Sequence, residues 1–296
     1  MLRETLRYRE KMPNAAYYAG NRYKIKAPQA RVISITSGKG GVGKTNVVAN
    51  LAYVLSQIGK KVLVVDADLG LANIDILLGL TPKYNLQHVI LGEKRLSEVI
   101  ISGPGGVRIL PASSGVEELA ALNSEQKKRL IVEFSFLDDN YDFLLIDTAA
   151  GISPNVIYFN LAASEIVILV EPDPTSFTDS YAMIKVLSVK YGVDYFKILL
   201  NNVTSENEAK EIFEKLHLVT DKFLQVRLEY LGYIFHDKKL REAVRMQRAV
   251  VEIFPYAKSS QCFHQIVKAL CDESTKDLGG NSVNRFINRL LGRDYL

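Results

Sequence analysis

The feature that most constrains this chain is a glycine-rich segment at residues 38–45, which reads Gly38-Lys39-Gly40-Gly41-Val42-Gly43-Lys44-Thr45. It fits the pattern G-x-x-x-x-G-K-[ST], a loop whose backbone N–H groups surround phosphate oxygens at the start of a helix. A β-branched run at residues 32–36 precedes it and a helical pattern at residues 45–58 follows it, as this loop requires. We therefore expect Lys44 to reach the β- and γ-phosphates of a nucleotide and the Thr45 hydroxyl to bind Mg²⁺.

Short apolar runs alternate with helix-length segments from residue 31 onward. The runs are rich in β-branched residues and lack polar alternation, which is typical of strands buried on both faces. The predicted fold is therefore an α/β P-loop NTPase fold, a mostly parallel sheet flanked by helices on both faces. The predicted strands are 32–36, 62–66, 107–111, 143–147, 166–170, 197–202 and 230–235. The apolar side of the helix at 45–58 is formed by Val47, Val48, Leu51, Ala52, Leu55 and Ile58.

Three carboxylates stand at the ends of predicted strands. Asp66 and Asp68 close the run VLVVDAD, and Asp147 closes the Walker-B-like run FLLID. Parallel strands place their carboxyl ends at one edge of a sheet, so these side chains should meet the phosphate loop, where a carboxylate can hold Mg²⁺ through water. The alternative is that they cap helices or turns, which explains one aspartate more easily than three. The pattern favours ATP hydrolysis.

A dinucleotide-binding fold is the main rival prediction. The glycines of the loop also spell G-x-G-x-x-G, and Asp66 lies about 20 residues further on, as that fold requires. This interpretation leaves the Lys44-Thr45 pair and Asp147 unexplained. The phosphate loop of an ATPase is therefore favoured.

Composition excludes several other classes of protein. The 296 residues contain no run of about 18 apolar residues, so no spanning helix is predicted. The first residues lack the apolar region of a secretory signal, and the two cysteines, Cys262 and Cys271, are too few for a disulfide framework. We expect a cytoplasmic protein, and its net charge of +4 gives little support to DNA binding.

The chain divides into three predicted regions. Residues 1–30 form a basic, tyrosine-rich N-terminal arm, and residues 31–275 form the P-loop ATPase domain. Residues 276–296 comprise a linker and a short amphipathic helix, in which Val283, Phe286, Ile287, Leu290 and Leu291 share one side and three arginines the other. This helix either packs on its own domain or lies on an anionic membrane surface through residues 282–293.

Several short sequence motifs of this chain resemble those of the deviant-Walker ATPases of the MinD/ParA class, and within that class those of the flagellar-number regulators (FlhG/FleN). The class is indicated by SGKGGVGKT at 37–45 together with DAD at 66–68. The branch is indicated by DADLGLANID at 66–75, LGLTP at 78–82, GPGGV at 103–107, DTAAGI at 147–152, EPDPTS at 171–176, TDKFL at 220–224 and QRAV at 247–250. The resemblance covers roughly residues 31–270.

The resemblance implies roles for individual residues. Lys39 is expected to reach across a nucleotide-sandwich dimer to the partner's ATP and to stabilise transition-state charge as an arginine finger does. Asp68 is expected to orient the attacking water, and Asn201 to hold the adenine. The implied site has catalytic Lys39, Lys44, Asp68 and Asp147; nucleotide-binding Gly38, Gly40, Gly41, Val42, Gly43, Lys44, Thr45 and Asn201; and metal-binding Thr45, Asp66 and Asp147.

The resemblance also implies partners and location. Relatives are monomers with ADP and dimers with ATP, and the dimers lie on the membrane through a C-terminal helix, here residues 282–293. Implied protein partners are a signal-recognition-type GTPase (FlhF), basal-body switch proteins or a sigma-54-type transcription activator. The N-terminal element that activates the GTPase in some relatives ends in Leu-Arg, as Leu6-Arg7 does, but its Asp-Gln-Ala part is missing here.

Other members of the same superfold are the alternatives. A MinD-like division-site ATPase would act with cell-division partners, and a ParA-like DNA-partition ATPase would need a basic DNA-facing surface. An iron–sulfur carrier would need paired cysteines near the dimer axis, and both cysteines lie far in sequence from the nucleotide motifs.

Overall fold

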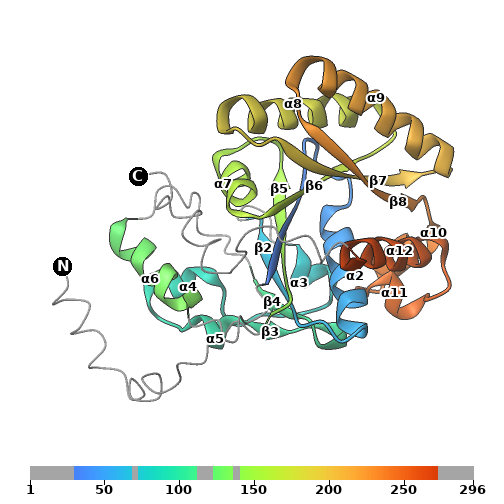
Figure 1. Cartoon of the computed structure of the whole chain (residues 1–296). Coiled ribbons are helices and arrows are strands. Elements are labelled where there is room, and N and C mark those ends of the chain that lie inside the picture. The colour runs from blue at the N-terminus through green and yellow to red at the C-terminus, as the bar shows by residue number, and fades with distance from the viewer. Residues whose placement is uncertain (1–29, 69–72, 112–122, 136–140, 273–296) are drawn as a thin grey trace.

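A single mostly parallel sheet organises the chain, whose computed structural model describes residues 30–68, 73–111, 123–135 and 141–272. These residues form an eight-stranded sheet with the order β3-β4-β2-β5-β1-β6-β7-β8 (Figure 1). All neighbouring strands are parallel except β3 and β4. The strands are β1 (Arg31–Ser37), β2 (Val62–Ala67), β3 (Ile101–Ser102), β4 (Arg108–Leu110), β5 (Phe143–Ala150), β6 (Glu165–Val170), β7 (Tyr195–Val203) and β8 (Arg227–Phe235).

The predicted fold class is confirmed, and each predicted strand has a counterpart in this sheet. The strand β3 was not predicted. It has only two residues and pairs antiparallel with β4 at the sheet edge, so it is too short to carry a recognisable pattern.

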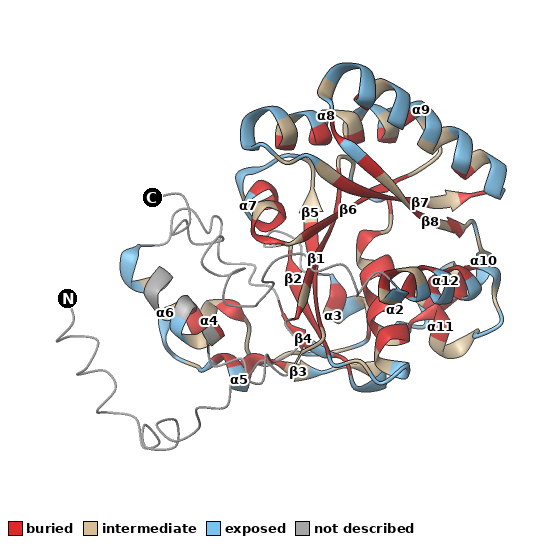
Figure 2. Cartoon of the chain, viewed as in Figure 1, coloured by how far each residue is buried: buried red, intermediate tan, exposed pale blue. Residues whose placement is uncertain are grey.

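Helices cover both faces of the sheet, and their outward sides are exposed (Figure 2). One face packs against α2 (Lys44–Gln57), α3 (Ile74–Leu77), α11 (Val250–Ile253) and α12 (Lys258–Asp272). The other packs against α4 (Leu86–Leu91), α5 (Leu96–Val99), α6 (Ser124–Ser135), α7 (Pro154–Ala162), α8 (Pro174–Tyr191) and α9 (Glu206–Leu224). Successive β1 residues, Val32 and Ile33, enter different cores, which explains why the strands lack polar alternation. The remaining elements are η2 (Pro104–Gly106) and α10 (Lys238–Arg245).

The helix α2 places the phosphate loop, because it begins at Lys44 and packs along the sheet. Its residues Val47, Val48, Leu51, Ala52 and Leu55 are buried, as their helical spacing predicts. The prediction for Ile58 was wrong: this residue is the C-cap, and its side chain is 52% exposed. The helical spacing no longer applies at that position, because the chain leaves the helix there.

The predicted N-terminal arm and C-terminal helix lie outside the described residues, so the three region limits stay predictions. None of the helices within the described ranges is long and apolar enough to cross a membrane. Both cysteines are free thiols.

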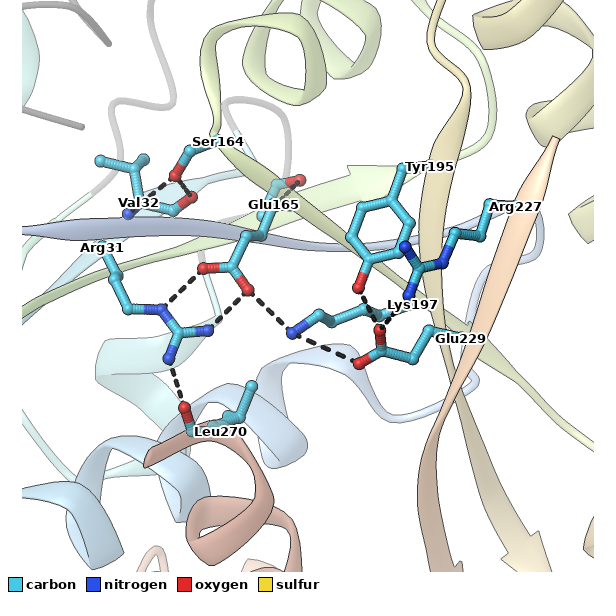
Figure 3. A network of polar contacts seen from close by, with 10 residues as sticks. Arg31, Val32, Ser164, Glu165, Tyr195, Lys197, Arg227, Glu229 and Leu270 are labelled. Carbon is cyan, nitrogen blue, oxygen red and sulfur yellow. Dashed lines mark hydrogen bonds and ion pairs between the residues drawn. The ribbon is translucent and has the colours of Figure 1, made fainter. Parts of the chain in front are cut away.

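A buried ionic network ties the amino edge of the sheet together (Figure 3). The guanidinium of Arg31 donates to both carboxylate oxygens of Glu165, at 2.7 and 2.6 Å. The ammonium of Lys197 lies 3.0 Å from Glu165 Oε2 and 3.7 Å from Glu229 Oε1. Arg31 also donates to the carbonyl of Leu270 in α12. Burial alone would raise the pKa of Glu165, but the two cations outweigh it and lower that pKa.

Replacing the central carboxylate tests this network. Glu165→Gln leaves two buried cations without their shared counter-charge and should lower the free energy of unfolding by about 3–5 kcal/mol in urea denaturation at pH 7. The half-buried Glu229 provides a control, and Glu229→Gln should lower the free energy of unfolding clearly less than Glu165→Gln does. Because the folded-state pKa of Glu165 is lowered, the advantage of the wild type should shrink as the pH falls below its ordinary value of 4.5. Equal losses for both variants would contradict the central role of Glu165.

Candidate functional site

The glycine-rich loop joins the end of β1 to the start of α2 at the carboxyl edge of the sheet. Gly41 and Gly43 have φ angles of 79° and 89°, which residues with a Cβ rarely adopt. Gly38 passes so close to α8 that a Cβ would stand 2.3 Å from the carbonyl carbon of Asp179. The loop therefore has the backbone shape that a phosphate cradle at a helix N-terminus needs.

Neighbouring strands hold this loop from both sides. On the β5 side, the Gly151 amide donates to the Ser37 carbonyl at 2.9 Å, and Gly40 faces the end of the strand. On the β7 side, the Asn201 side-chain amide donates to the Val42 carbonyl at 2.8 Å. The predicted adenine residue is thus brought to the loop, and in this structure its Nδ2 contacts the loop backbone.

Lys44 lies inside the loop, where its ammonium donates to Ser37 Oγ at 2.8 Å. The Ser37 hydroxyl in turn donates to the Lys39 carbonyl at 2.7 Å. Burial lowers the pKa of Lys44, although the nearby carboxylates of Asp147 and Asp68 oppose this shift. Ser37 was not predicted as a site residue, although it opens the SGKGGVGKT string.

The parallel pairing of β2 with β5 sets Asp66 directly beside Asp147. Burial and the neighbouring Asp147 raise the pKa of Asp66 to about 8, against hydrogen bonds donated by the backbone N–H groups of Asp68, Ile74 and Asn73. Burial raises the pKa of Asp147 to about 7, although a hydrogen bond with the Thr45 side chain opposes it. Two buried carboxylates side by side are a strongly unfavourable charge arrangement unless a cation or proton joins them.

The residues present fit a magnesium ion. The buried Oδ1 of Asp147 has no hydrogen-bond partner, and the available donors are carboxylate and hydroxyl oxygens. In the described ranges, no three His, Cys, Asp or Glu side chains converge as an all-protein metal cage. Mg²⁺ typically binds through one or two carboxylates together with substrate phosphates, which suits Asp66, Asp147 and Thr45.

Lys39 lies apart from these groups. Its ammonium is 3.1 Å from Asp173 Oδ2, and its side chain is 38% exposed. Asp173 caps α8 by accepting from Thr175 and Ser176, and these bonds, with Lys39, hold the pKa of Asp173 well below its usual range. The structure therefore brings together Lys44, Thr45, Asp66, Asp68 and Asp147, and turns Lys39 to another loop. The Asp173-Pro174 dipeptide signals a helix start, but not this ion pair.

A second residue that the sequence did not reveal is Asn202. It forms a bulge in β7 with a φ of 64°, a left-handed conformation that is uncommon outside glycine. Its side chain contacts His236 Nδ1 at 2.6 Å and hydrogen-bonds with Glu171. Asn202 therefore connects the end of β7 with the segments that follow β6 and β8.

Comparison with known proteins identifies the family of this chain. A family model described as an AAA domain matches residues 30–190. The antiactivator FleN of Pseudomonas aeruginosa is 49% identical over 238 residues, which are 80% of this chain and 85% of FleN. The chain belongs to the FleN/FlhG branch of the MinD/ParA-type P-loop ATPases.

Two further relatives agree with this family. The flagellum site-determining protein YlxH of Helicobacter pylori is 34% identical, over 95% of this chain and 99% of YlxH. The septum site-determining protein MinD of Pyrococcus horikoshii, solved with Mg-ADP, superposes with a TM-score of 0.67 and 29% identity, over 85% of this chain and 99% of MinD. Nucleotide and Mg²⁺ binding are thus properties of the FleN/MinD family to which this chain belongs.

The raised pKa of Asp66 predicts an effect of pH on the nucleotide-free protein. The folded state keeps a proton up to about pH 8 that the unfolded chain loses near 3.8, so this group costs stability as pH rises between them. Asp66→Asn removes that cost. Its melting temperature should exceed that of wild type by an amount that grows from about pH 5 to pH 8, with about 2–4 °C for each kcal/mol.

The exposed Asp221→Asn on α9 is the matched control and should follow the wild type at every pH. Addition of Mg²⁺ and nucleotide should stabilise the wild type more than Asp66→Asn. Parallel pH curves for the wild type and Asp66→Asn would show that the buried pair carries no such cost.

Proposed function

We propose that this chain is a Mg²⁺-dependent ATPase switch that dimerises with ATP and thereby regulates flagellar number and placement. The observation that carries the switch is Lys39, a second lysine in the phosphate loop that lies outside the phosphate-binding set and pairs with Asp173 at 3.1 Å. The flagellar role is supported by the 49% identity with FleN, an antiactivator, and by the similarity to YlxH, a flagellum site-determining protein.

Each side chain of the loop has a separate role in this proposal. Backbone N–H groups from Gly38 to Thr45 bind the phosphates, and Lys44, already buried, neutralises the β- and γ-phosphates. Thr45, Asp66 and Asp147 would hold Mg²⁺, which would supply neutralisation of the phosphate charge. Asp68 orients the attacking water. Asn201, on the β7 side of the loop and away from the carboxylates, holds the adenine.

Lys39 makes hydrolysis depend on dimerisation. In the single chain its ammonium is paired with Asp173, so it contributes nothing to its own phosphates. In the dimer, Lys39 leaves this partly exposed ion pair and meets the negative charge of the ATP bound to the second subunit. Its positive charge at that position stabilises the transition state of hydrolysis. Hydrolysis returns the protein to the ADP monomer, so the rate of hydrolysis sets how long the dimer lasts.

The location and partners follow from the same cycle. Residues 282–293, outside the described part, bind anionic membrane weakly as single copies and more strongly as two copies in the ATP dimer. The ADP monomer returns to the cytosol. The name antiactivator favours a transcription activator as partner, alongside a signal-recognition-type GTPase (FlhF) or basal-body switch proteins. Division-site and DNA-partition roles use the same chemistry, and the identity with FleN favours the flagellar role over both.

Lys39 gives the first test. In wild type, the ATP hydrolysis rate per protomer should rise with protein concentration, because dimers supply the trans lysine. Lys39→Ala should remove this rise and lower the rate at high concentration by at least about tenfold. It should still bind ATP, whereas Lys44→Ala should not. The exposed Lys185→Ala on α8 is a control for loss of one lysine. A wild-type rate independent of protein concentration would exclude the dimer mechanism.

Complementation gives the second test. In Pseudomonas aeruginosa lacking FleN, expression of this chain should restore the number of flagella per cell, counted by electron microscopy. Lys39→Ala should fail at equal expression. A chain truncated after Gly280 should restore it poorly and leave the membrane fraction, because two weak anchors are lost. A stable wild-type chain that changes cell division or plasmid retention but not flagellar number would favour the division-site or partition role.

A further inference from the structure

The C-terminal end of α10 is fixed to the segment that follows β2. Gln247 has a φ of 55°, and its side-chain amide donates to the Ile76 carbonyl at 2.8 Å. A Cβ on Gly79 would stand 3.5 Å from Gln247 Cβ, so the two segments are in contact. Gln247 therefore holds α3 and the end of α10 together, although they are 171 residues apart.

Two large apolar side chains next to this contact are exposed. Ile76 is 60% exposed and Met246, next to Gln247, is 53% exposed. Both belong to segments whose other apolar residues are buried or partly buried, including Ile74 and Ala243. Single exposed apolar residues are ordinary, but here the hydrogen bond from Gln247 to the Ile76 carbonyl joins the two segments that carry them, and these two residues form the centre of a candidate interface.

A basic stripe runs along α10 and ends next to Met246. Lys238, Arg241 and Arg245 recur at i, i+3 and i+7 and are exposed on the outer side of α10. None of them makes an ion pair with another described residue, whereas the nearby Lys239 and Arg248 are paired with Glu242 and Glu252. The stripe therefore presents three cations without an ion-pair partner among the described residues, on the helix that leads to Met246.

The same segment reaches the carboxylate pair of the site. The backbone N–H groups of Asn73 and Ile74 donate to Asp66 Oδ2 at 3.2 and 3.5 Å, at the start of α3. A ligand that contacts Ile76 thus touches a helix of only four residues whose first turn bonds to Asp66.

We propose that Lys238, Arg241, Arg245, Met246 and Ile76 form a docking surface for an acidic amphipathic helix of a partner protein. Glutamates or aspartates of the partner meet the stripe, and its apolar face covers Ile76 and Met246. Binding biases the position of α3, so the partner alters the environment of Asp66. The docking itself needs no nucleotide, while its effect on hydrolysis rests on the proposed ATPase function.

Charge and position disfavour other occupants. A second copy of this chain would set the same basic stripe against itself across a two-fold axis. Nucleic acid would meet the cations but not the apolar centre. The helix α12 starts beside Asp237 at the carboxyl edge, and Leu270 in its last turn accepts a hydrogen bond from Arg31 at the amino edge. The described part of α12 therefore ends at the amino edge, whereas Ile76 follows the carboxyl end of β2.

The test uses a fluorescein-labelled peptide of about 18 residues, with leucine on one helical face and glutamate on the other. Fluorescence anisotropy should show binding to the full-length wild type without nucleotide. Arg241→Glu/Arg245→Glu should weaken it by at least about tenfold, because two attractions become repulsions. Lys185→Glu/Lys190→Glu on α8, with the same change in net charge, should leave it within about twofold.

Further arms separate the apolar and electrostatic parts. A scrambled peptide of equal composition should bind weakly, and Ile76→Ala/Met246→Ala should lose affinity for the amphipathic peptide while circular dichroism shows a native fold. Equal binding of the scrambled peptide, or equal loss in the α8 control, would overturn the proposal. So would stronger dependence on Arg241 and Arg245 for phosphatidylglycerol vesicles or duplex DNA than for the peptide.

Hydrogen exchange separates this proposal from the ATPase proposal. The bound peptide should change the exchange of the Asn73 and Ile74 amides in the nucleotide-free protein, and unchanged exchange would remove the link to Asp66. Loss of ATP hydrolysis with intact peptide binding would refute the ATPase function but leave the docking surface. Intact ATP hydrolysis without peptide binding would refute the docking surface but leave the ATPase function.

Discussion

The pairing of β2 with β5 is the constraint around which the site is arranged. It fixes the Asp66 and Asp147 carboxylates as neighbours in a buried position, where both pKa values are raised. Such an arrangement is costly in isolation and becomes favourable only when positive charge arrives. The loop supplies Lys44 and the Thr45 hydroxyl at that position. The unfavourable free energy of the carboxylate pair in the nucleotide-free protein is therefore relieved when the ligand binds, and this relief favours the ligand-bound state.

One loop carries two lysines with opposite surroundings. Lys44 is buried and bonded within the loop, whereas Lys39 is partly exposed and paired with a separate loop after β6. The first arrangement suits permanent binding of phosphate, and the second suits a group that changes partners. In the proposed switch, the lysine that binds phosphate and the lysine that controls hydrolysis are therefore only five positions apart in the sequence.

Much of this architecture follows from local sequence patterns, and the exceptions share one physical cause. The strands were recognisable because burial on both faces requires apolar runs, and the loop because its glycines have no substitutes. The ion pair of Lys39 with Asp173 spans 134 residues, and the contact of Gln247 with Ile76 spans 171. Both join segments that are far apart in the sequence and meet only in the folded chain, which composition and periodicity do not encode. The two-residue β3 and the exposed Ile58 were missed because periodicity fails at the ends of elements.

The ionic network at the amino edge of the sheet joins the two ends of the described chain, the start of β1 and the end of α12. Arg31, the first residue of β1, is bonded both to Glu165 and to the carbonyl of Leu270 near the end of α12. A pull on the C-terminal end of α12 is therefore passed to β1 rather than peeling the helix from the sheet. That strand runs seven residues to Ser37, whose hydroxyl accepts from Lys44. A force applied at the C-terminal end of α12 is thus transmitted through Arg31 along β1 to the phosphate loop.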